Sequence, residues 1–327
     1  MIPDPSPLTP HSRIYIAGHR GLVGSALMRT LRARGYTNII TRTHSELDLT
    51  EQAAVRLFFA EQKPEFVFLA AAKVGGIVAN NTYPAEFIHQ NLAIQTNVIH
   101  EAFKSRIKRL IFLGSSCIYP RECPQPMKEE YLLTGPLEAT NRPYAVAKIA
   151  GIEMCWAYNR QYGTKYLAVM PTNLYGPGDN YDLENSHVLP ALIRKMHDAR
   201  ENGAAQVTVW GTGTPRREFL YSEDMADATL FLAEMPDVNF TSLLNEDQPP
   251  LINIGCGEDL TIRELAEMVK DIVGFRGQLF FDTTRPDGTP QKLLSVKMLN
   301  RLGWKARTGM REGIELAYRD YQRMVLQ

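Results

Sequence analysis

Short apolar runs alternate with stretches of helical periodicity from Arg13 to about Pro171. Runs such as Phe66–Ala71 are continuously apolar, as in strands that are buried on both faces of a sheet. Strands that alternate with helices predict a doubly wound parallel sheet with right-handed crossovers, which is an α/β fold of the Rossmann type. The expected strands are 13–17, 38–42, 66–71, 109–114 and 166–170, and the expected helices include 22–34, 51–62, 86–104 and 144–162.

The alternation breaks after Pro171, where proline, glycine and asparagine are frequent. Beyond this point we expect helices at 188–200 and 261–273, with Thr261 as the N-cap of the second, and strands at 207–210 and 251–254. The pattern predicts a smaller C-terminal α/β substrate-binding domain, with the chain crossing back to the first sheet. The expected division is a disordered leader at 1–12, which has three prolines in its first seven residues, a dinucleotide-binding domain at 13–172, and a mainly substrate-binding part at 173–327.

The helices expected at 86–104 and 144–162 carry apolar residues outside their main stripe, among them Phe87 and Val98 in the first and Met154 and Tyr158 in the second. These residues fit a helix that only packs against the sheet. They fit equally a second apolar face that pairs with another subunit.

Composition narrows the range of partners. The chain has 327 residues with a formal net charge of zero, and it has neither a basic stripe nor an acidic tail, which argues against nucleic acid or an anionic membrane as a partner. No apolar run approaches the roughly 20 residues of a membrane span. The four cysteines show no metal-binding spacing, so we expect a reduced, cytoplasmic protein without a structural metal.

A glycine-punctuated turn follows the first expected strand. Gly18, Gly21 and Gly24 lie between the run 14–17 and the helix that begins near Leu22. At such a turn bare backbone can approach a pyrophosphate at a helix N-terminus. Glycines also gather in ordinary turns, but the position between strand and helix favours dinucleotide binding.

Tyr144 and Lys148 are four residues apart, so they share one face of the helix at 144–162. A cation held there favours the phenolate, which would let the tyrosine exchange protons near neutral pH. Ser115 stands at the carboxyl end of the fourth strand, where a hydroxyl can bond a substrate carbonyl. A solvated Tyr–Lys pair and turn-forming serines are the simpler interpretation of each feature alone. Together with the glycine turn they indicate carbonyl reduction by a nicotinamide.

Two further residues are candidate acid/base groups. Cys117 is close to Ser115, and a thiol pKa of about 8.5 suits proton abstraction beside a carbonyl once a neighbour lowers it. His187 lies at a loop-to-helix junction, and histidine titrates near neutral pH. They could face opposite sides of one sugar ring and invert carbon stereochemistry. Which one is acid and which is base stays open.

The end of the second strand bears on cofactor choice. An NAD site usually has an acidic residue there, whereas this chain has Arg42, with Arg20 in the glycine turn. Cations match a ribose 2′-phosphate, so NADP is favoured. Glu46 and Asp48 follow a few residues later and keep NAD open.

For a nucleotide-sugar substrate, a base could stack on Trp210, and the cations available for a diphosphate are Lys195, Arg217, Arg285 and Lys292.

From Arg13 to Trp304 the chain resembles the extended short-chain dehydrogenase/reductases that act on nucleotide sugars, and within them the GDP-L-fucose synthase family. The glycine turn, Ser115 and the Tyr144–Lys148 pair are common to the superfamily. Several segments resemble that family more specifically: Ala17-Gly18-His19-Arg20-Gly21-Leu22-Val23-Gly24-Ser25, Ala70-Ala71-Ala72-Lys73-Val74-Gly75-Gly76-Ile77, Gly114-Ser115-Ser116-Cys117-Ile118-Tyr119-Pro120, Pro171-Thr172-Asn173-Leu174-Tyr175-Gly176-Pro177, Asn185-Ser186-His187-Val188 and Pro286-Asp287-Gly288-Thr289-Pro290.

The resemblance implies conversion of GDP-4-keto-6-deoxy-D-mannose to GDP-L-fucose. Cys117 and His187 would exchange the C3 and C5 protons, NADPH would reduce C4, and Tyr144 would protonate the oxygen with help from Lys148 and Ser115. It also implies a homodimer through the helices at 86–104 and 144–162. The implied substrate contacts are Lys195, Trp210, Arg217 and Asp287, and the implied cofactor contacts are Gly18, His19, Arg20, Gly21, Leu22, Val23, Gly24, Arg42, His44, Asp48, Leu49, Ala70, Ala71, Leu113, Gly114, Ser115, Ser116, Tyr144, Lys148, Pro171, Thr172, Asn173, Leu174 and His187.

Two departures from the family pattern concern charge. His44 stands where a second arginine is expected, which weakens the 2′-phosphate site, and Lys195 stands at a diphosphate position where arginine is frequent. Two other functions fit these residues less well. A nucleotide-sugar 4-epimerase or 4,6-dehydratase has no need of Cys117 together with His187. A silent dinucleotide-binding protein has no reason to keep Ser115, Tyr144 and Lys148.

Overall fold

The computed structural model describes residues 7–183, 186–244, 246–285 and 287–326. Its main sheet has six parallel strands in the order β2-β1-β3-β4-β5-β9. This order confirms the predicted α/β fold with a doubly wound parallel sheet. The strands are β1 (Ile14–Ala17), β2 (Ile39–Ile40), β3 (Phe66–Leu69), β4 (Arg109–Leu113), β5 (Tyr166–Pro171) and β9 (Leu251–Ile254).

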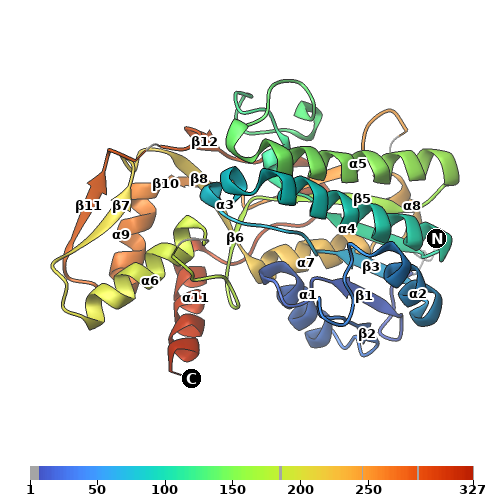
Figure 1. The fold of residues 1–327 in the computed structure, drawn as a ribbon, viewed down its shortest axis with the longest axis horizontal. Helices are drawn as coiled ribbons and strands as arrows, with labels where there is room; N and C mark the ends of the chain where they lie inside the picture. Colours follow the sequence, from blue (N-terminus) through green and yellow to red (C-terminus); the bar gives the residue numbers. More distant parts are fainter. Residues whose placement is uncertain (1–6, 184–185, 245, 286, 327) are drawn as a thin grey trace.

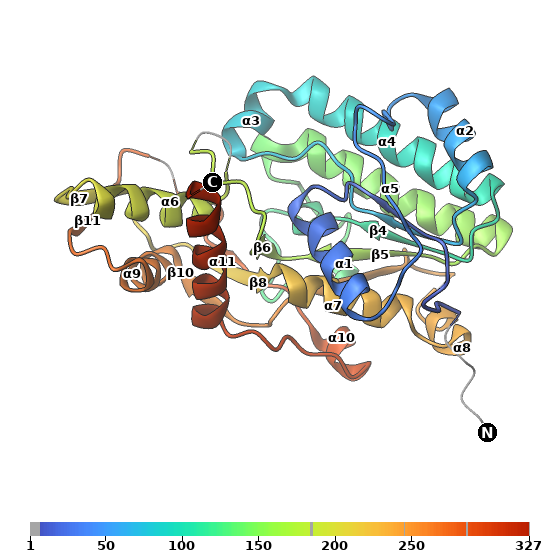
Figure 2. The ribbon, with the colours of Figure 1, turned by 90° about the horizontal axis from the view of Figure 1, so that it is seen from below.

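Helices cover both faces of this sheet, as Figures 1 and 2 show. In β1, Ile14 and Ile16 belong to the core cluster on one face, while Tyr15 and Ala17 belong to the cluster on the other. The continuously apolar strands are therefore buried on both sides, as predicted. One face carries α2 (Gln52–Gln62), α4 (Pro84–Lys104) and α5 (Arg142–Tyr162), and the other carries α1 (Leu22–Ala33) and α7 (Ser222–Ala233).

The C-terminal part is built from shorter strands around a third core cluster. Two further sheets are small: β10, β8 and β12 lie in that order with β6 beside β8, and β11 pairs with β7. In Figure 1 the β7–β11 pair stands at the end of the molecule opposite β2. The strands are β6 (Asn173–Tyr175), β7 (Gln206–Trp210), β8 (Arg216–Tyr221), β10 (Asp259–Thr261), β11 (Gln278–Asp282) and β12 (Gln291–Lys292).

The helices of this part include the two that the sequence predicts. The second of these, α9, begins with the expected capping box, because Thr261 Oγ1 accepts a bond from Glu264 N at 3.1 Å and Glu264 Oε2 accepts one from Thr261 N at 2.7 Å. The helices are α6 (Val188–Glu201), α9 (Ile262–Val273) and α11 (Met310–Val325), and the short ones elsewhere are α3 (Ile77–Thr82), α8 (Asp237–Thr241) and α10 (Lys297–Arg301).

Several expectations concern residues near the limits of the description. Residues 1–6 of the expected leader lie outside the described residues, as do Asn185 and Pro286 of the family-like segments. Leu8, within the range expected to be disordered, is only 4% exposed and packs in the main core. In the described part of the chain, the helices are all too short or too polar to cross a membrane.

Candidate active site

The glycine turn connects β1 to α1 and requires two of its glycines. Gly18 has φ +84°, and a Cβ on it would lie 2.7 Å from Ala71 backbone. A Cβ on Gly24 would lie 2.1 Å from the Gly18 carbonyl oxygen. The first turn of α1 has no acidic residue, and its N-cap, Gly21, has no side chain to bond the free N–H groups. This cradle of bare backbone at a helix N-terminus fits the pyrophosphate of a dinucleotide.

The ribose end of this cradle is mixed in charge. Arg20 and Arg42 both act electrostatically on Glu46. The Glu46 carboxylate accepts bonds from Thr43 N and Oγ1, and these bonds lower its pKa most. The side chain of His44 is 83% exposed, with Nδ1 3.8 Å from Asp48 Oδ1. Two arginines thus stand where a 2′-phosphate would bind, with carboxylates close by.

Ser115, Tyr144 and Lys148 meet at the carboxyl end of β4. Tyr144 and Lys148 lie one turn apart on α5, and the Tyr144 hydroxyl is hydrogen-bonded to Ser115. Lys148 Nζ donates to the Leu113 carbonyl at 2.7 Å and lies 5.8 Å from the centre of the Tyr144 ring. The structure therefore brings together the three groups that the sequence proposes for carbonyl reduction.

Burial dominates the electrostatics of this group. It raises the pKa of the Tyr144 phenol, an effect that Cys117 reinforces and the Ser115 hydrogen bond opposes. It also lowers the pKa of Lys148 to about 8. The expectation that Lys148 favours the phenolate is thus outweighed, because the ammonium is directed at the Leu113 carbonyl. A protonated phenol is the state that can donate to a carbonyl oxygen.

Cys117 lies in the short 3₁₀ helix Ser116–Ile118 directly after β4 and is 7% exposed. Burial raises the pKa of its thiol, whereas the Ser115 hydrogen bond, Lys292 and Lys148 lower it, in that order. His187 is the N-cap residue of α6 and is exposed at the level of the whole residue. Desolvation of its imidazole ring nevertheless lowers the pKa of the ring. Both groups can exchange protons, and they come from separate parts of the chain.

A pair of cations lies on adjacent strands of the β10–β8–β12 sheet. Arg217 on β8 and Lys292 on β12 are direct partners in a parallel register, so their side chains share one face. Burial lowers the pKa of both, and Asp287 acts against this effect on Arg217. Two partly buried cations side by side suit a diphosphate.

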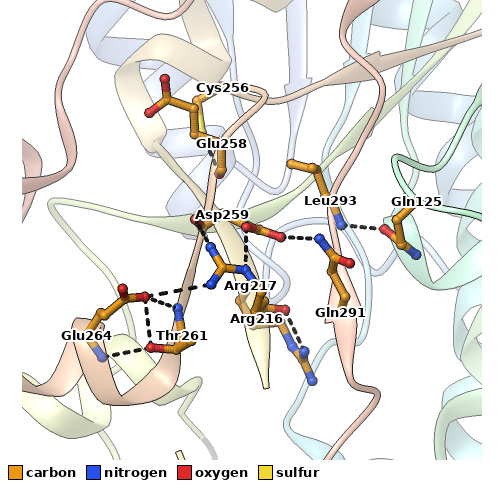
Figure 3. Close-up of polar contacts among 10 residues, drawn as sticks. All are labelled: Gln125, Arg216, Arg217, Cys256, Glu258, Asp259, Thr261, Glu264, Gln291 and Leu293. Carbon is orange, nitrogen blue, oxygen red and sulfur yellow. Dashed lines mark hydrogen bonds and ion pairs between the residues drawn. The ribbon is translucent and has the colours of Figure 1, made fainter. Parts of the chain in front are cut away.

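Arg216 precedes Arg217 and takes part in a separate network, drawn in Figure 3. Its Nε donates to Asp259 Oδ1 at 2.8 Å, and Gln291 Nε2 donates to Asp259 Oδ2 at 2.6 Å. The Asp259 carboxylate thereby ties β8 to β12. The sequence gives no signal for Asp259, since only the fold brings residues 216, 259 and 291 together.

Trp210 ends β7 and is 54% exposed. Lys195 Nζ lies 5.4 Å and Arg285 Cζ 5.0 Å from the ring centre. Asp287 lies on the same side of the molecule, but its carboxylate accepts bonds from Thr212 N at 3.0 Å and Thr212 Oγ1 at 2.7 Å. The aromatic ring and the cations are accessible for a nucleotide, whereas Asp287 first of all orders the loop after β7.

Comparison with known proteins agrees with this geometry. Residues 14–255 match the model of the NAD dependent epimerase/dehydratase family. The chain is 55% identical to GDP-L-fucose synthase 1 of Arabidopsis thaliana, covering 96% of this chain and 94% of that protein. It is 53% identical to GDP-L-fucose synthase of Escherichia coli strain K12, covering 94% and 95%.

A solved structure extends the likeness to three dimensions. MlghC, a GDP-mannoheptose C4 reductase from Campylobacter jejuni with NADP bound, superposes with a TM-score of 0.88 at 42% identity, over 96% of this chain and 99% of that one. These matches confirm the resemblance that the sequence motifs indicate.

Proposed function

The chain belongs to the NAD-dependent epimerase/dehydratase family, and we infer that it converts GDP-4-keto-6-deoxy-D-mannose to GDP-L-fucose. The reaction is epimerisation at C3 and C5 followed by reduction of C4, with NADPH as the cofactor. The observation that carries this conclusion is the match to GDP-L-fucose synthases over nearly the whole chain, combined with the Ser115–Tyr144–Lys148 group at the edge of the sheet.

We assign the reduction to that group. The bound nicotinamide supplies the hydride to C4. Tyr144 donates a proton to the C4 oxygen, and its buried phenol is protonated at neutral pH. Ser115 forms hydrogen bonds with this hydroxyl and with the substrate oxygen. The Lys148 ammonium, whose pKa is about 8, then returns a proton to the Tyr144 hydroxyl.

We assign the epimerisation to Cys117 and His187. A proton at C3 or C5 lies next to the C4 carbonyl, so its removal gives an enolate that can be protonated on the opposite face. Cys117 is next to Ser115, which binds the same carbonyl, and this position supports a role at the adjacent carbons. His187 would serve the opposite face of the ring.

Binding is divided between the two parts of the chain. We assign the cofactor to residues 13–172 and to the segment Pro171–Leu174, with His187 at its nicotinamide end. The guanine is assigned to Trp210, and the diphosphate to Lys195, Arg217 and Lys292, since these cations are near the ring or in register with each other. Asp287 contributes by ordering the loop after β7.

A homodimer and a cytoplasmic location complete the proposal. The helices α4 and α5 carry a cluster of aromatic rings. The ring of Phe103 stacks on that of Tyr162 with 4.2 Å between ring centres, and its centre lies 5.4 Å from that of Tyr158. Tyr162 is 50% exposed, so pairing of these helices would cover apolar surface. The four free cysteines support a reducing compartment. Light scattering after size-exclusion chromatography tests the dimer.

The function is tested in one reaction in heavy water. The purified protein is mixed with GDP-4-keto-6-deoxy-D-mannose and NADPH, and nicotinamide absorbance is followed together with the proton spectrum of the sugar. We expect NADPH to be consumed and deuterium to enter C3 and C5 of a fucosyl product. Oxidation without deuterium would leave a plain 4-reductase, and no oxidation would contradict the enzyme assignment.

A further inference from the structure

Strand β12 lies between β8 and the segment that follows Cys117. On one side Lys292 is in register with Arg217. On the other, Met127 N donates to the Leu293 carbonyl at 2.7 Å, and Leu293 N donates to Gln125 Oε1 at 2.9 Å. Figure 3 shows the second of these bonds. The strand is therefore bonded along both edges at the position of Lys292.

Buried carboxylates hold the strand at either end of this position. Glu218 is fully buried, and its Oε2 accepts a bond from Leu294 N at 2.9 Å while Oε1 accepts one from Gly257 N at 2.7 Å. At residue 291 the Asp259 carboxylate holds the side chain of Gln291. Lys292 thus has little freedom to move along β8.

The titratable groups that act electrostatically on Lys292 come from four places in the chain. They are Cys117 after β4, Arg217 on β8, Glu138 before the turn at 139–141, and Cys123. Within the described residues, the Lys292 ammonium has no hydrogen bond or ion pair. The groups that act electrostatically on Cys117 are Lys292 and Lys148, and Cys117 in turn acts on Tyr144. Lys148 donates to Leu113, so Lys292 is the cation left without such a bond.

We propose that Lys292 is a positioning residue of the epimerisation, which acts through Cys117: its ammonium, held in place by β12, stabilises the thiolate that removes the sugar proton. This inference rests on the proposed function. The sulfur takes the proton from C3 or C5, the electrons of the C–H bond pass to the C4 oxygen as an enolate, and the returning proton restores the ketone. No oxidant or reductant is needed.

The charge matters because burial works against the thiolate. Burial raises the pKa of Cys117, and below that pKa each further unit reduces the thiolate fraction about tenfold. Loss of the Lys292 charge should raise the pKa again. The rate of proton exchange should then fall at neutral pH, and its rise with pH should move to higher pH.

The experiment compares Lys292→Met and Lys292→Gln with Lys292→Arg, which keeps the charge. Lys297→Met is the matched control, since Lys297 is an exposed lysine at the start of α10. Deuterium entry at C3 and C5 is measured from pH 6 to 10 at saturating GDP-4-keto-6-deoxy-D-mannose without NADPH. We expect both neutral variants to exchange about tenfold more slowly at pH 7, with the profile about one unit higher. Lys292→Arg should recover most of the rate, and Lys297→Met should match the wild type.

A second measurement separates this role from diphosphate binding. In Lys292→Met, reduction of an already epimerised 4-ketone at saturating concentration should fall less than deuterium exchange does, since Tyr144 is untouched and saturation offsets weaker binding of the diphosphate. If the neutral variants only raise KM and keep the wild-type pH profile of exchange, the inference is wrong. If the wild type itself shows no exchange while it oxidises NADPH, the proposed epimerisation fails before Lys292 is tested.

Discussion

The two sides of the active site are held in place by different means. At the end of β4 the reducing group is fixed by the main chain, because Lys148 binds the Leu113 carbonyl and Ser115 begins a 3₁₀ turn. On the β10–β8–β12 side, the carboxylates Glu218 and Asp259 join short strands. The first side follows from local spacing on one helix and one strand. The second depends on strands that are far apart in sequence.

This difference implies that the two sides can be disrupted separately. The reducing group stores a proton in a buried phenol and a buried lysine. The other side holds two cations, Arg217 and Lys292, next to each other on adjacent strands, where burial lowers the pKa of both. A change in the reducing group should therefore slow the reduction of C4, whereas a change on the β10–β8–β12 side should act on the nucleotide sugar.

Tyr144→Phe should give the largest separation. Without the hydroxyl no proton reaches the C4 oxygen, and reduction should fall about 10²–10⁴-fold. Deuterium exchange at C3 and C5 should persist, because Cys117 and His187 are unchanged. Nicotinamide absorbance and the proton spectrum of the sugar measure the two stages together. Loss of exchange to the same extent would contradict separate roles.

Cys117→Ser should have the opposite effect with a slightly smaller magnitude. A serine hydroxyl is a far weaker acid than a thiol, so exchange at C3 and C5 should slow by about 10²–10³-fold. An already epimerised 4-ketone should still be reduced at close to the wild-type rate. If that ketone were reduced no better than GDP-4-keto-6-deoxy-D-mannose, Cys117 would belong to the reduction instead.

The reducing group shows how much the sequence could predict. The spacing of Tyr144 and Lys148 places them on one helix face, and Ser115 follows a buried strand, so their meeting follows from the fold class alone. Their pKa shifts were not predictable, because burial depends on packing from both faces of the sheet. The expectation that Lys148 lowers the pKa of Tyr144 was wrong, because burial raises this pKa and Lys148 donates to the Leu113 carbonyl instead.

On the β10–β8–β12 side, the sequence predicted which residues carry charge but not how they are arranged. Arg217 and Lys292 are visible as cations, but their register follows from β8 and β12, and β12 has only two residues. Glu218 gave no signal, since a single acidic residue beside two arginines usually marks a solvated strand. Its burial depends on tertiary structure, in which β9 lies at the edge of the main sheet and the following turn brings Gly257 N to the Glu218 carboxylate.

Lys148 should make stability depend on pH. Its pKa of about 8 in the folded protein lies below the ordinary 10.5, so between these values the unfolded chain holds a proton that the folded protein has released. Stability of the wild type relative to Lys148→Met should therefore rise with pH from about 8 to 10, by about 2–3 kcal/mol in all. Urea unfolding at several pH values measures this. The lost hydrogen bond to Leu113 adds a constant, pH-independent amount to the difference in unfolding free energy between the two proteins. If that difference did not change with pH, the burial argument would be contradicted.

Glu218→Gln should raise the KM for the nucleotide sugar about tenfold, because it acts on the β12 side of the site. An amide keeps one acceptor but sets N–H groups against the main-chain donors of Leu294 or Gly257, which loosens β12. We expect KM for the nucleotide sugar to rise and KM for NADPH to stay unchanged. Glu258→Gln is the control, because Glu258 is exposed on the same turn. Equal effects on both substrates would show that Glu218 supports the whole fold.

His44→Arg should have the smallest effect, and on the cofactor side only. His44 is exposed, lies 3.8 Å from the Asp48 carboxylate and stands where the family pattern has an arginine in addition to Arg20 and Arg42. A third permanent cation should lower KM for NADPH about threefold, an exposed electrostatic effect of less than about 1 kcal/mol. KM for NADH should not change, since NADH has no 2′-phosphate. The gain should shrink as salt rises, and an equal gain for NADH would place His44 away from the 2′-position.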